Sequence, residues 1–118
     1  TTTAGTTITP GTTSDGTYVS LGSTTRALRW WQVGMQIAAA DTSHTGGIMH
    51  IDLAYGNGTN FVPILTDVVA GVSASEVASI RPQPFICEVP VPSGSTIYGR
   101  AQFSAAVDTT QMAAYGAA

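Results

Sequence analysis

Charge is scarce in this sequence of 118 residues. Charged residues make up 9% of the chain, against about a quarter of an average soluble domain. Lysine is absent, the four basic residues are arginines, and seven acidic residues leave a formal net charge of −3. Proteins that bind nucleic acids through charge need a basic patch that neutralises several phosphates. The scattered arginines do not supply such a patch, so we expect no nucleic-acid partner.

The lack of charge also bears on the protein surface. Thr, Ala, Gly and Ser fill the positions that charged residues usually take. A surface of this kind does little to keep protein molecules apart, so we expect other subunits to cover much of it. Arginine without lysine fits contacts between proteins, because the guanidinium group binds carboxylates in a fork and stacks on aromatic rings. An ordinary extracellular sandwich with an uncharged surface is the alternative.

Cysteine and long hydrophobic runs are also missing. The single cysteine, Cys87, excludes an intrachain disulfide. The alternation around it places its thiol on the same strand face as Phe85 and Val89, so we expect a buried and inert side chain. No apolar run reaches the length of a membrane span, and the Thr-rich start lacks the charged and apolar regions of a signal peptide. We therefore expect no membrane contact.

The length is that of one ordinary domain. Residues 1–16 are mostly Thr, Gly, Ser and Pro, and Ile8 is their only large apolar residue. We interpret residues 1–16 as an extended N-terminal arm and residues 17–118 as a single β-sandwich domain. In an assembly such an arm can become ordered along a neighbouring subunit, and a frayed terminus is the alternative.

Short apolar-alternating runs separated by turn residues follow from Thr17 onward, and they are typical of an all-β sandwich or barrel. In the first long run Trp31 faces one way and Trp30 the other, as in a half-buried strand of an antiparallel sheet. The pattern predicts about eight strands, at residues 18–21, 27–38, 47–55, 61–67, 72–80, 84–89, 96–104 and 111–115.

Two segments qualify this assignment. Residues 71–80 are the one serious alternative for a helix, because Ser73 and Glu76 have the spacing of a capping box. Prolines at positions 82, 84, 90 and 92 bracket the strand expected at 84–89. Because proline lacks a backbone N–H, these positions suit the ends of a strand or an exposed sheet edge.

No set of residues supports catalysis or metal binding. His50 and Asp52 share a strand face, but a structural metal site needs about four ligands, so we expect both to be surface residues on the outward face. The stretch 71–75 lacks the final glycine of a nucleophile elbow. Residues 56–58 lack the third glycine of a phosphate-binding loop. The sequence therefore predicts a protein that is not an enzyme, with no catalytic residue, cofactor or metal.

Four stretches share a pattern with one family of proteins. They are Arg29-Trp30-Trp31-Gln32-Val33-Gly34, Ile51-Asp52-Leu53-Ala54-Tyr55-Gly56, Ser75-Glu76 and Val89-Pro90-Val91-Pro92-Ser93-Gly94-Ser95-Thr96-Ile97-Tyr98-Gly99-Arg100-Ala101-Gln102. Together they resemble virion structural proteins of tailed bacteriophages. In these proteins a segment of the type I-P-x-G-S/T-x-I-x-x-R-x-Q forms the hairpin into a late strand of a jelly-roll-like sandwich. The resemblance covers about residues 29–104, and the chain departs from the pattern at Val91 and Ser93.

The resemblance implies an antiparallel, jelly-roll-like β-sandwich that is part of a phage particle. We favour a capsid decoration (cement) protein on the capsid surface of the virion. Such a protein binds the outer surface of the major capsid protein shell, stabilises the expanded head, and forms a dimer or trimer at a symmetry axis. The alternative is a tail or fibre domain that recognises host-surface carbohydrate, to which Asn57 would also contribute.

The candidate interface combines two residue types. Arginine side chains would pair with carboxylates of the partner, and aromatic side chains would fill its pockets. The candidates are Arg29, Trp30, Tyr98, Arg100 and Gln102.

Overall fold

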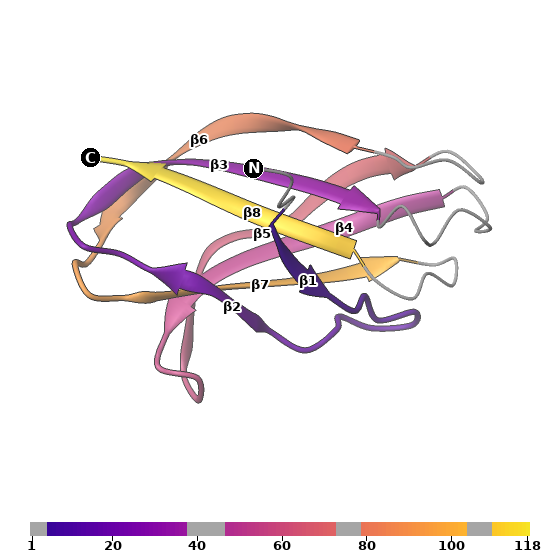
Figure 1. Ribbon diagram of the computed structural model, residues 1–118, viewed down its shortest axis with the longest axis horizontal. Helices are drawn as coiled ribbons and strands as arrows, with labels where there is room; N and C mark the ends of the chain where they lie inside the picture. The colour runs from indigo at the N-terminus through magenta and orange to yellow at the C-terminus, as the bar shows by residue number, and fades with distance from the viewer. Residues whose placement is uncertain (1–4, 38–46, 73–78, 104–109) are drawn as a thin grey trace.

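The computed structural model describes residues 5–37, 47–72, 79–103 and 110–118. The strands in chain order are β1 (Thr6–Ile8), β2 (Val19–Ser23), β3 (Leu28–Ile37), β4 (Gly47–Gly56), β5 (Phe61–Val72), β6 (Ser79–Val91), β7 (Thr96–Phe103) and β8 (Thr110–Ala117). They form two four-stranded antiparallel sheets that face each other (Figure 1). The predicted all-β sandwich is confirmed. The described part of the chain has no helix that could cross a membrane.

The pairing of the strands makes the sandwich a jelly roll. Sheet 1 has the order β1-β8-β3-β6, and sheet 2 has the order β2-β7-β4-β5. The first strand pairs with the eighth, the second with the seventh, the third with the sixth and the fourth with the fifth, all antiparallel. The two halves of the chain thus form one long hairpin wrapped into two sheets, which is the arrangement of double-sheet jelly rolls.

The core lies between the sheets and follows the alternation of the strands. On β3, Trp31 is only 2% exposed whereas Trp30 is 47% exposed, so the predicted inward and outward faces are confirmed. On β7 every second residue is buried, and the series ends at Phe103. The other large side chains buried in the core are Ile8, Met49, Ile51, Leu53, Val91, Ile97 and Met112. Removal of this apolar surface from water is the main force that holds the sheets together.

From Gly5 to Gly16 the N-terminal segment lies against the domain. β1 pairs with β8, and the side chain of Ile8 is in the core. Further along, the Gly11 amide donates to the Ala101 carbonyl oxygen at 3.0 Å, and the Phe103 amide donates to the Gly11 carbonyl oxygen at 2.8 Å. The composition suggested a free arm because the segment has few apolar side chains. In the structure the segment is held by backbone hydrogen bonds and by one isoleucine. Residues 1–4 of the arm lie outside the described residues.

Most of the other strand predictions correspond to observed strands. The predicted strands at 18–21, 27–38, 47–55, 61–67, 84–89, 96–104 and 111–115 correspond to β2 through β8, of which β5 and β6 are several residues longer than predicted. No strand was predicted at the position of β1. The strand predicted at 72–80, and its helical alternative, lie mostly at residues 73–78, outside the described residues.

The prolines occupy a sheet edge, as their lack of an N–H group requires. β6 contains Pro82, Pro84 and Pro90, and it lies at the edge of sheet 1, where β3 is its neighbour. Cys87 also belongs to β6. Its side chain lies outside the described residues, so its burial stays a prediction.

Candidate functional site

The five candidate interface residues lie on strands of both sheets. Arg29 and Trp30 are at the start of β3 in sheet 1, whereas Tyr98, Arg100 and Gln102 are on β7 in sheet 2. Alternate residues of a strand point to opposite faces, and the residues between the three on β7 are buried in the core. Trp30 and the three residues on β7 therefore point away from each other, and one flat partner surface cannot cover them all. Arg29 is exposed beside the register shift of β3 between Leu28 and Trp30.

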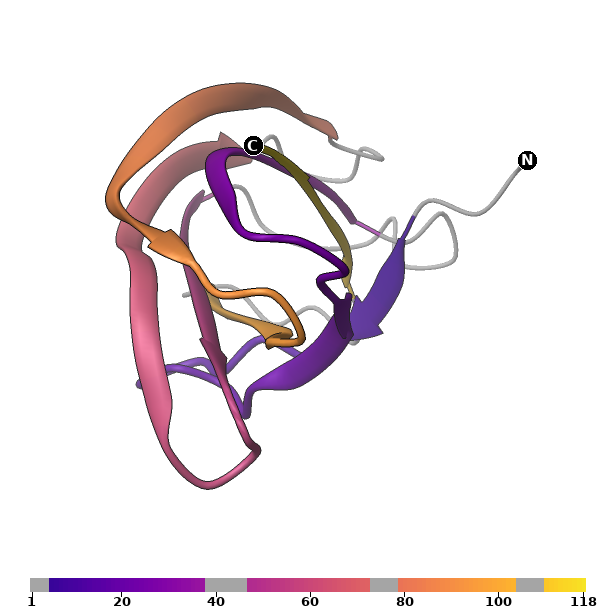
Figure 2. The ribbon, with the colours of Figure 1, turned by 90° about the vertical axis from the view of Figure 1, so that its left-hand side faces the viewer.

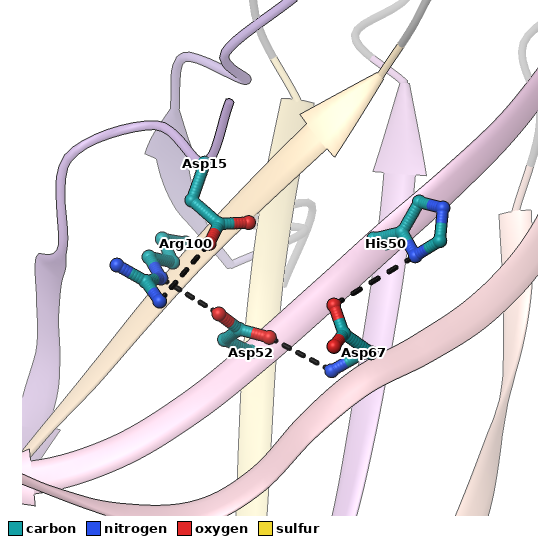
Figure 3. A network of polar contacts seen from close by, with 5 residues as sticks. All are labelled: Asp15, His50, Asp52, Asp67 and Arg100. Atoms are coloured by element: carbon teal, nitrogen blue, oxygen red, sulfur yellow. Dashed lines mark hydrogen bonds and ion pairs between the residues drawn. The ribbon is translucent and has the colours of Figure 1, made fainter. Parts of the chain in front are cut away.

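On the outer face of sheet 2, Arg100 is held by residues of its own chain. It lies directly opposite Asp52 on β4, and its Nε donates to Asp52 Oδ2 at 2.7 Å (Figure 3). Its Nη2 lies 3.1 Å from Asp15 Oδ2, and its guanidinium carbon lies 4.4 Å from the centre of the Tyr18 ring. The guanidinium is thus bound on two edges by carboxylates and on one face by an aromatic ring.

This environment shifts two pKa values. Burial lowers the pKa of Arg100, but the hydrogen bond with Asp52 and the nearby charges outweigh it, so the pKa is raised above its ordinary value. Burial also raises the pKa of Tyr18, which the charge of Arg100 opposes. Arg100 therefore stays charged and Tyr18 stays neutral at physiological pH.

Asp52 was predicted to be an exposed residue of the outward face, and this prediction is wrong. Its side chain does lie on the outward face, but it is 3% exposed. Arg100 covers one carboxylate oxygen, and the other oxygen accepts a hydrogen bond of 2.8 Å from the Asp67 amide. An outward position on a strand implies exposure only where nothing lies over it, and here neighbouring strands supply both partners.

The partner amide comes from an irregularity in β5. Ile51 pairs with Val68 and Leu53 pairs with Leu65, so β5 has one more residue than β4 between these pairs. Such a β-bulge leaves a residue without its regular partner. Asp67 lies in the bulge with a positive φ of 52°, and its amide donates to Asp52. Asp52 therefore joins β4, β5 and β7 through one buried carboxylate.

His50 and Gln102 lie beside this network. They are opposite each other on β4 and β7, and both are half-buried. His50 Nδ1 is 3.8 Å from Asp67 Oδ1, too far for a hydrogen bond and close enough for an ion pair when the imidazole is protonated. Among the described residues, no three His, Cys, Asp or Glu side chains are close enough together to hold a metal ion.

An aromatic cluster completes the outer face of sheet 2. The rings of Tyr18 and Phe61 are stacked with centroids 4.5 Å apart, and Tyr98 meets Phe61 edge-on at 5.0 Å. All three are half-buried. The adjoining β4–β5 loop is held by Asn57, whose Oδ1 accepts the amides of Thr59 and Asn60. Sequence analysis missed Tyr18 and Phe61 because the three rings are about 40 positions apart in the chain, and no local pattern brings them together.

The outer face of sheet 1 is built differently. Trp30 is 47% exposed and Tyr115, on β8, is 61% exposed. Because Trp30 is opposite Ala117 and Gln32 is opposite Tyr115, the two aromatic residues are diagonal neighbours on one face. Together with Gln32 they line a hollow of about 290 Å³. None of the described residues that line this hollow is charged. Tyr115 was missed because nothing near it in the sequence marks it as exposed.

Comparison of the chain with models of protein families, with curated proteins and with solved structures finds no match.

Proposed function

We propose that the protein is a virion structural protein that decorates the outer surface of a capsid shell. The observation that carries this proposal is the outer face of sheet 1, where Trp30 and Tyr115 are exposed around a hollow whose described lining residues carry no charge. Aromatic residues are enriched, and charged residues depleted, at the centres of protein interfaces. The resemblance to phage virion proteins supplies the partner, which is the major capsid protein.

The fold is compatible with this role without being proof of it. Double-sheet jelly rolls occur in viral capsid domains and also in lectin domains. Because one fold serves many functions, the argument rests on the surface residues.

Sheet 1 is a better attachment surface than sheet 2. The guanidinium of Arg100 already has two carboxylate partners in its own chain, and Tyr98 packs against Phe61. Binding a partner through these groups would first break contacts that stabilise the fold. Trp30 and the exposed Arg29 have no such contacts among the described residues. We therefore assign attachment to these two residues and treat Tyr98, Arg100 and Gln102 as supports of the fold.

The mechanism is thermodynamic. A protein that binds only the expanded shell stabilises that state by mass action, by about 2.7 kcal/mol per site when its free concentration is 100 times the dissociation constant. Because many copies bind one particle, their stabilising free energies add up and make the particle resist disassembly. Self-association as a dimer or trimer would place several copies of the sheet 1 face on the shell together, and sedimentation of the free protein measures it.

The deciding experiment is the copy number of the polypeptide in purified particles from its source, measured by mass spectrometry against the major capsid protein. Hundreds of copies in a simple ratio would support decoration. A few copies per particle would indicate instead that the protein is part of the tail or a fibre. Absence from the particle would overturn the proposal.

A second candidate is favoured by the aromatic cluster of sheet 2. The half-buried rings of Tyr18, Phe61 and Tyr98 lie beside the loop of Asn57. Aromatic faces next to amide groups suit a sugar ring, and jelly rolls include lectin domains. In this alternative the protein is a tail or fibre domain that recognises host-surface carbohydrate. A glycan array tests it, with Asn57→Ala as the variant that should lose any signal.

A further inference from the structure

The loop between β4 and β5 contains the dipeptide Asn57-Gly58. In both Figure 1 and Figure 2 this loop projects beyond the neighbouring strands. Residues 57–60 are all exposed to solvent. In an asparagine followed by glycine, the side-chain amide carbon lies within reach of the next backbone nitrogen, and no side chain hinders their approach. The loop is therefore a candidate site for a covalent reaction within the chain.

The side chain of Asn57 is held over the backbone that follows it. Its Oδ1 accepts hydrogen bonds from the Thr59 amide at 3.0 Å and from the Asn60 amide at 2.9 Å. The Asn57 amide in turn donates to the Asn60 carbonyl oxygen at 3.3 Å, which closes the loop. Two donors on one carbonyl oxygen stabilise the negative charge that develops there when the carbon is attacked, as in an oxyanion hole. The loop therefore activates Cγ of Asn57 toward a nucleophile.

The backbone nitrogen of Gly58 is available as that nucleophile. Gly58 is exposed, and its N–H has no hydrogen-bond acceptor among the residues that the structure describes. A Cβ atom at Gly58 would contact only the Tyr98 hydroxyl, at 3.4 Å, so the space around the nitrogen is open. Hydroxide from the solvent can therefore reach this N–H and remove its proton.

We propose that Asn57 is a site of spontaneous deamidation in the folded protein. The deprotonated Gly58 nitrogen attacks Cγ of Asn57, and the new N–Cγ bond closes a succinimide ring. The Cγ–Nδ2 bond then breaks, and Nδ2 takes a proton from water and leaves as ammonia. Water hydrolyses the ring at one of its two carbonyl carbons. Cleavage of the N–Cγ bond gives aspartate, and cleavage of the original peptide bond gives isoaspartate. Overall one water is consumed and one ammonia is released, and nothing is oxidised or reduced.

The two products change the loop differently. Each adds one negative charge to the formal net charge of −3. In aspartate, the side-chain carboxylate can still accept the amides of Thr59 and Asn60. In isoaspartate, the main chain runs through Cβ and Cγ, so this side-chain acceptor is lost and with it the turn. Because the Tyr98 hydroxyl lies beside Gly58, the altered loop borders the aromatic cluster of sheet 2.

Asn60 provides a comparison within the same loop. It is the only other asparagine of the chain, and it is exposed as well. The residue after it is Phe61, which begins β5 and pairs with Gly56 of β4. The phenylalanine side chain and the strand pairing both hinder attack by the Phe61 nitrogen. Asn60 should therefore keep its amide while Asn57 reacts.

The test follows deamidation of the full-length protein during incubation at mildly alkaline pH. Chymotrypsin, which cleaves after Tyr55 and Phe61, releases residues 56–61 for mass spectrometry. Deamidation raises the mass by about 1 Da, and chromatography against synthetic standards separates aspartate from isoaspartate. We expect both products at Asn57, at a rate within about tenfold of that in the synthetic peptide of the same sequence. A rate more than about tenfold below that of the peptide would show that the fold protects Asn57, and would overturn the proposal.

Two variants assign the reaction to this dipeptide. Asn57→Gln keeps an amide but would have to form a larger, slower ring, so the more acidic species seen on isoelectric focusing should disappear. Gly58→Ala places a methyl group beside the attacking nitrogen and should slow the reaction at least about tenfold. Its matched control is Gly94→Ala in the β6–β7 turn, since Gly58 and Gly94 have similar φ values of 89° and 80°. Gly94→Ala should deamidate at the rate of the unchanged protein.

The outcomes bear on this proposal alone, because it does not depend on decoration of a capsid. Persistence of the acidic species in Asn57→Gln would assign the reaction to another amide and overturn the proposal. Equal slowing in Gly58→Ala and Gly94→Ala would also overturn it, because the effect would then follow from backbone strain in general. Thermal unfolding of each variant checks that the compared proteins are folded during the incubation.

Discussion

The two outer faces of the sandwich hold the same residue types in different surroundings. On sheet 2, Arg100 and Tyr98 are held by neighbours from the same chain. On sheet 1 and the adjoining end of the sandwich, Arg29 and Trp30 are exposed and make no such contacts among the described residues. The difference teaches that an arginine beside an aromatic residue is a candidate for binding only where its own chain leaves it free.

From this difference we predict that separate residues govern stability and the proposed attachment. Residues of the sheet 2 network should matter to the free energy of unfolding and little to attachment. Residues of the sheet 1 face should behave in the opposite way. The following predictions are ordered by the size of the expected effect, and each would break this division if it failed.

The largest effect is expected from Asp52→Ala. The substitution leaves the Arg100 guanidinium and the Asp67 amide without their shared carboxylate. We expect a loss of about 2–4 kcal/mol in the free energy of unfolding, below the cost for a fully buried pair because Arg100 is partly exposed. Urea unfolding measures it. The control is Asp67→Asn, which keeps a residue that tolerates positive φ and should cost less than about 0.5 kcal/mol; equal losses would contradict the role of Asp52.

The next effect compares Trp30→Ala with Tyr98→Ala. Loss of Trp30 should weaken attachment to shells at least about tenfold and change stability by less than about 1 kcal/mol. Loss of Tyr98 should cost about 1–2 kcal/mol of stability, because its ring packs on Phe61, and leave attachment unchanged. Co-sedimentation measures attachment and urea unfolding measures stability for both variants. We expect each variant to change only one of these two quantities. A Trp30 variant that unfolds would show that this side chain belongs to the core.

A smaller effect is expected at Thr24, in the connection between β2 and β3. Thr24→Val keeps the shape of the side chain and removes the hydroxyl that bonds Pro92 and Ser95. We expect a loss of about 1–2 kcal/mol, since water can reach part of the turn and replace these bonds. Ser23→Ala, at an exposed neighbouring position, is the control and should be near neutral. Equal free energies of unfolding for Thr24→Val and Ser23→Ala would show that the Thr24 hydroxyl does not hold the turn between β6 and β7.

The smallest expected effect is a loss of stability at alkaline pH. The pKa of Tyr18 is raised from 10.0 in the folded protein, mainly by burial. The folded state therefore keeps the phenol proton at a pH where the unfolded state loses it, and stability falls as the pH rises above about 10. Tyr18→Phe should flatten this fall in unfolding measurements from about pH 9 to about pH 11. An equally steep fall in the variant would assign it to other groups.

The sequence predicted the strands well because alternation is a local property. Trp30 and Trp31 are adjacent, and their opposite orientations follow from the geometry of one strand. The pairing of β1 with β8 is not local, and no pattern near Ile8 marks it. In the same way, the burial of Asp52 depends on a bulge in β5, which alternation cannot reveal.

The candidate site was predicted in part for the same reason. Five residues of suitable type were chosen by their position on outward strand faces, and the structure distributes them over two sheets. Which of them are free depends on Asp15, Asp52 and Tyr18, which approach Arg100 from other segments. A sequence without knowledge of the pairing cannot distinguish an arginine with partners from one without.

The pairing of first and last strands also constrains how the molecule forms. β8 lies between β1 and β3, so sheet 1 cannot close until β8 has left the ribosome. Until then β1 lacks its partner, and the edge of β3 that β8 will occupy is open to other strands. Contacts between strands so far apart in the chain make folding slow. Sheet 1 should therefore assemble only after β8 has been synthesised.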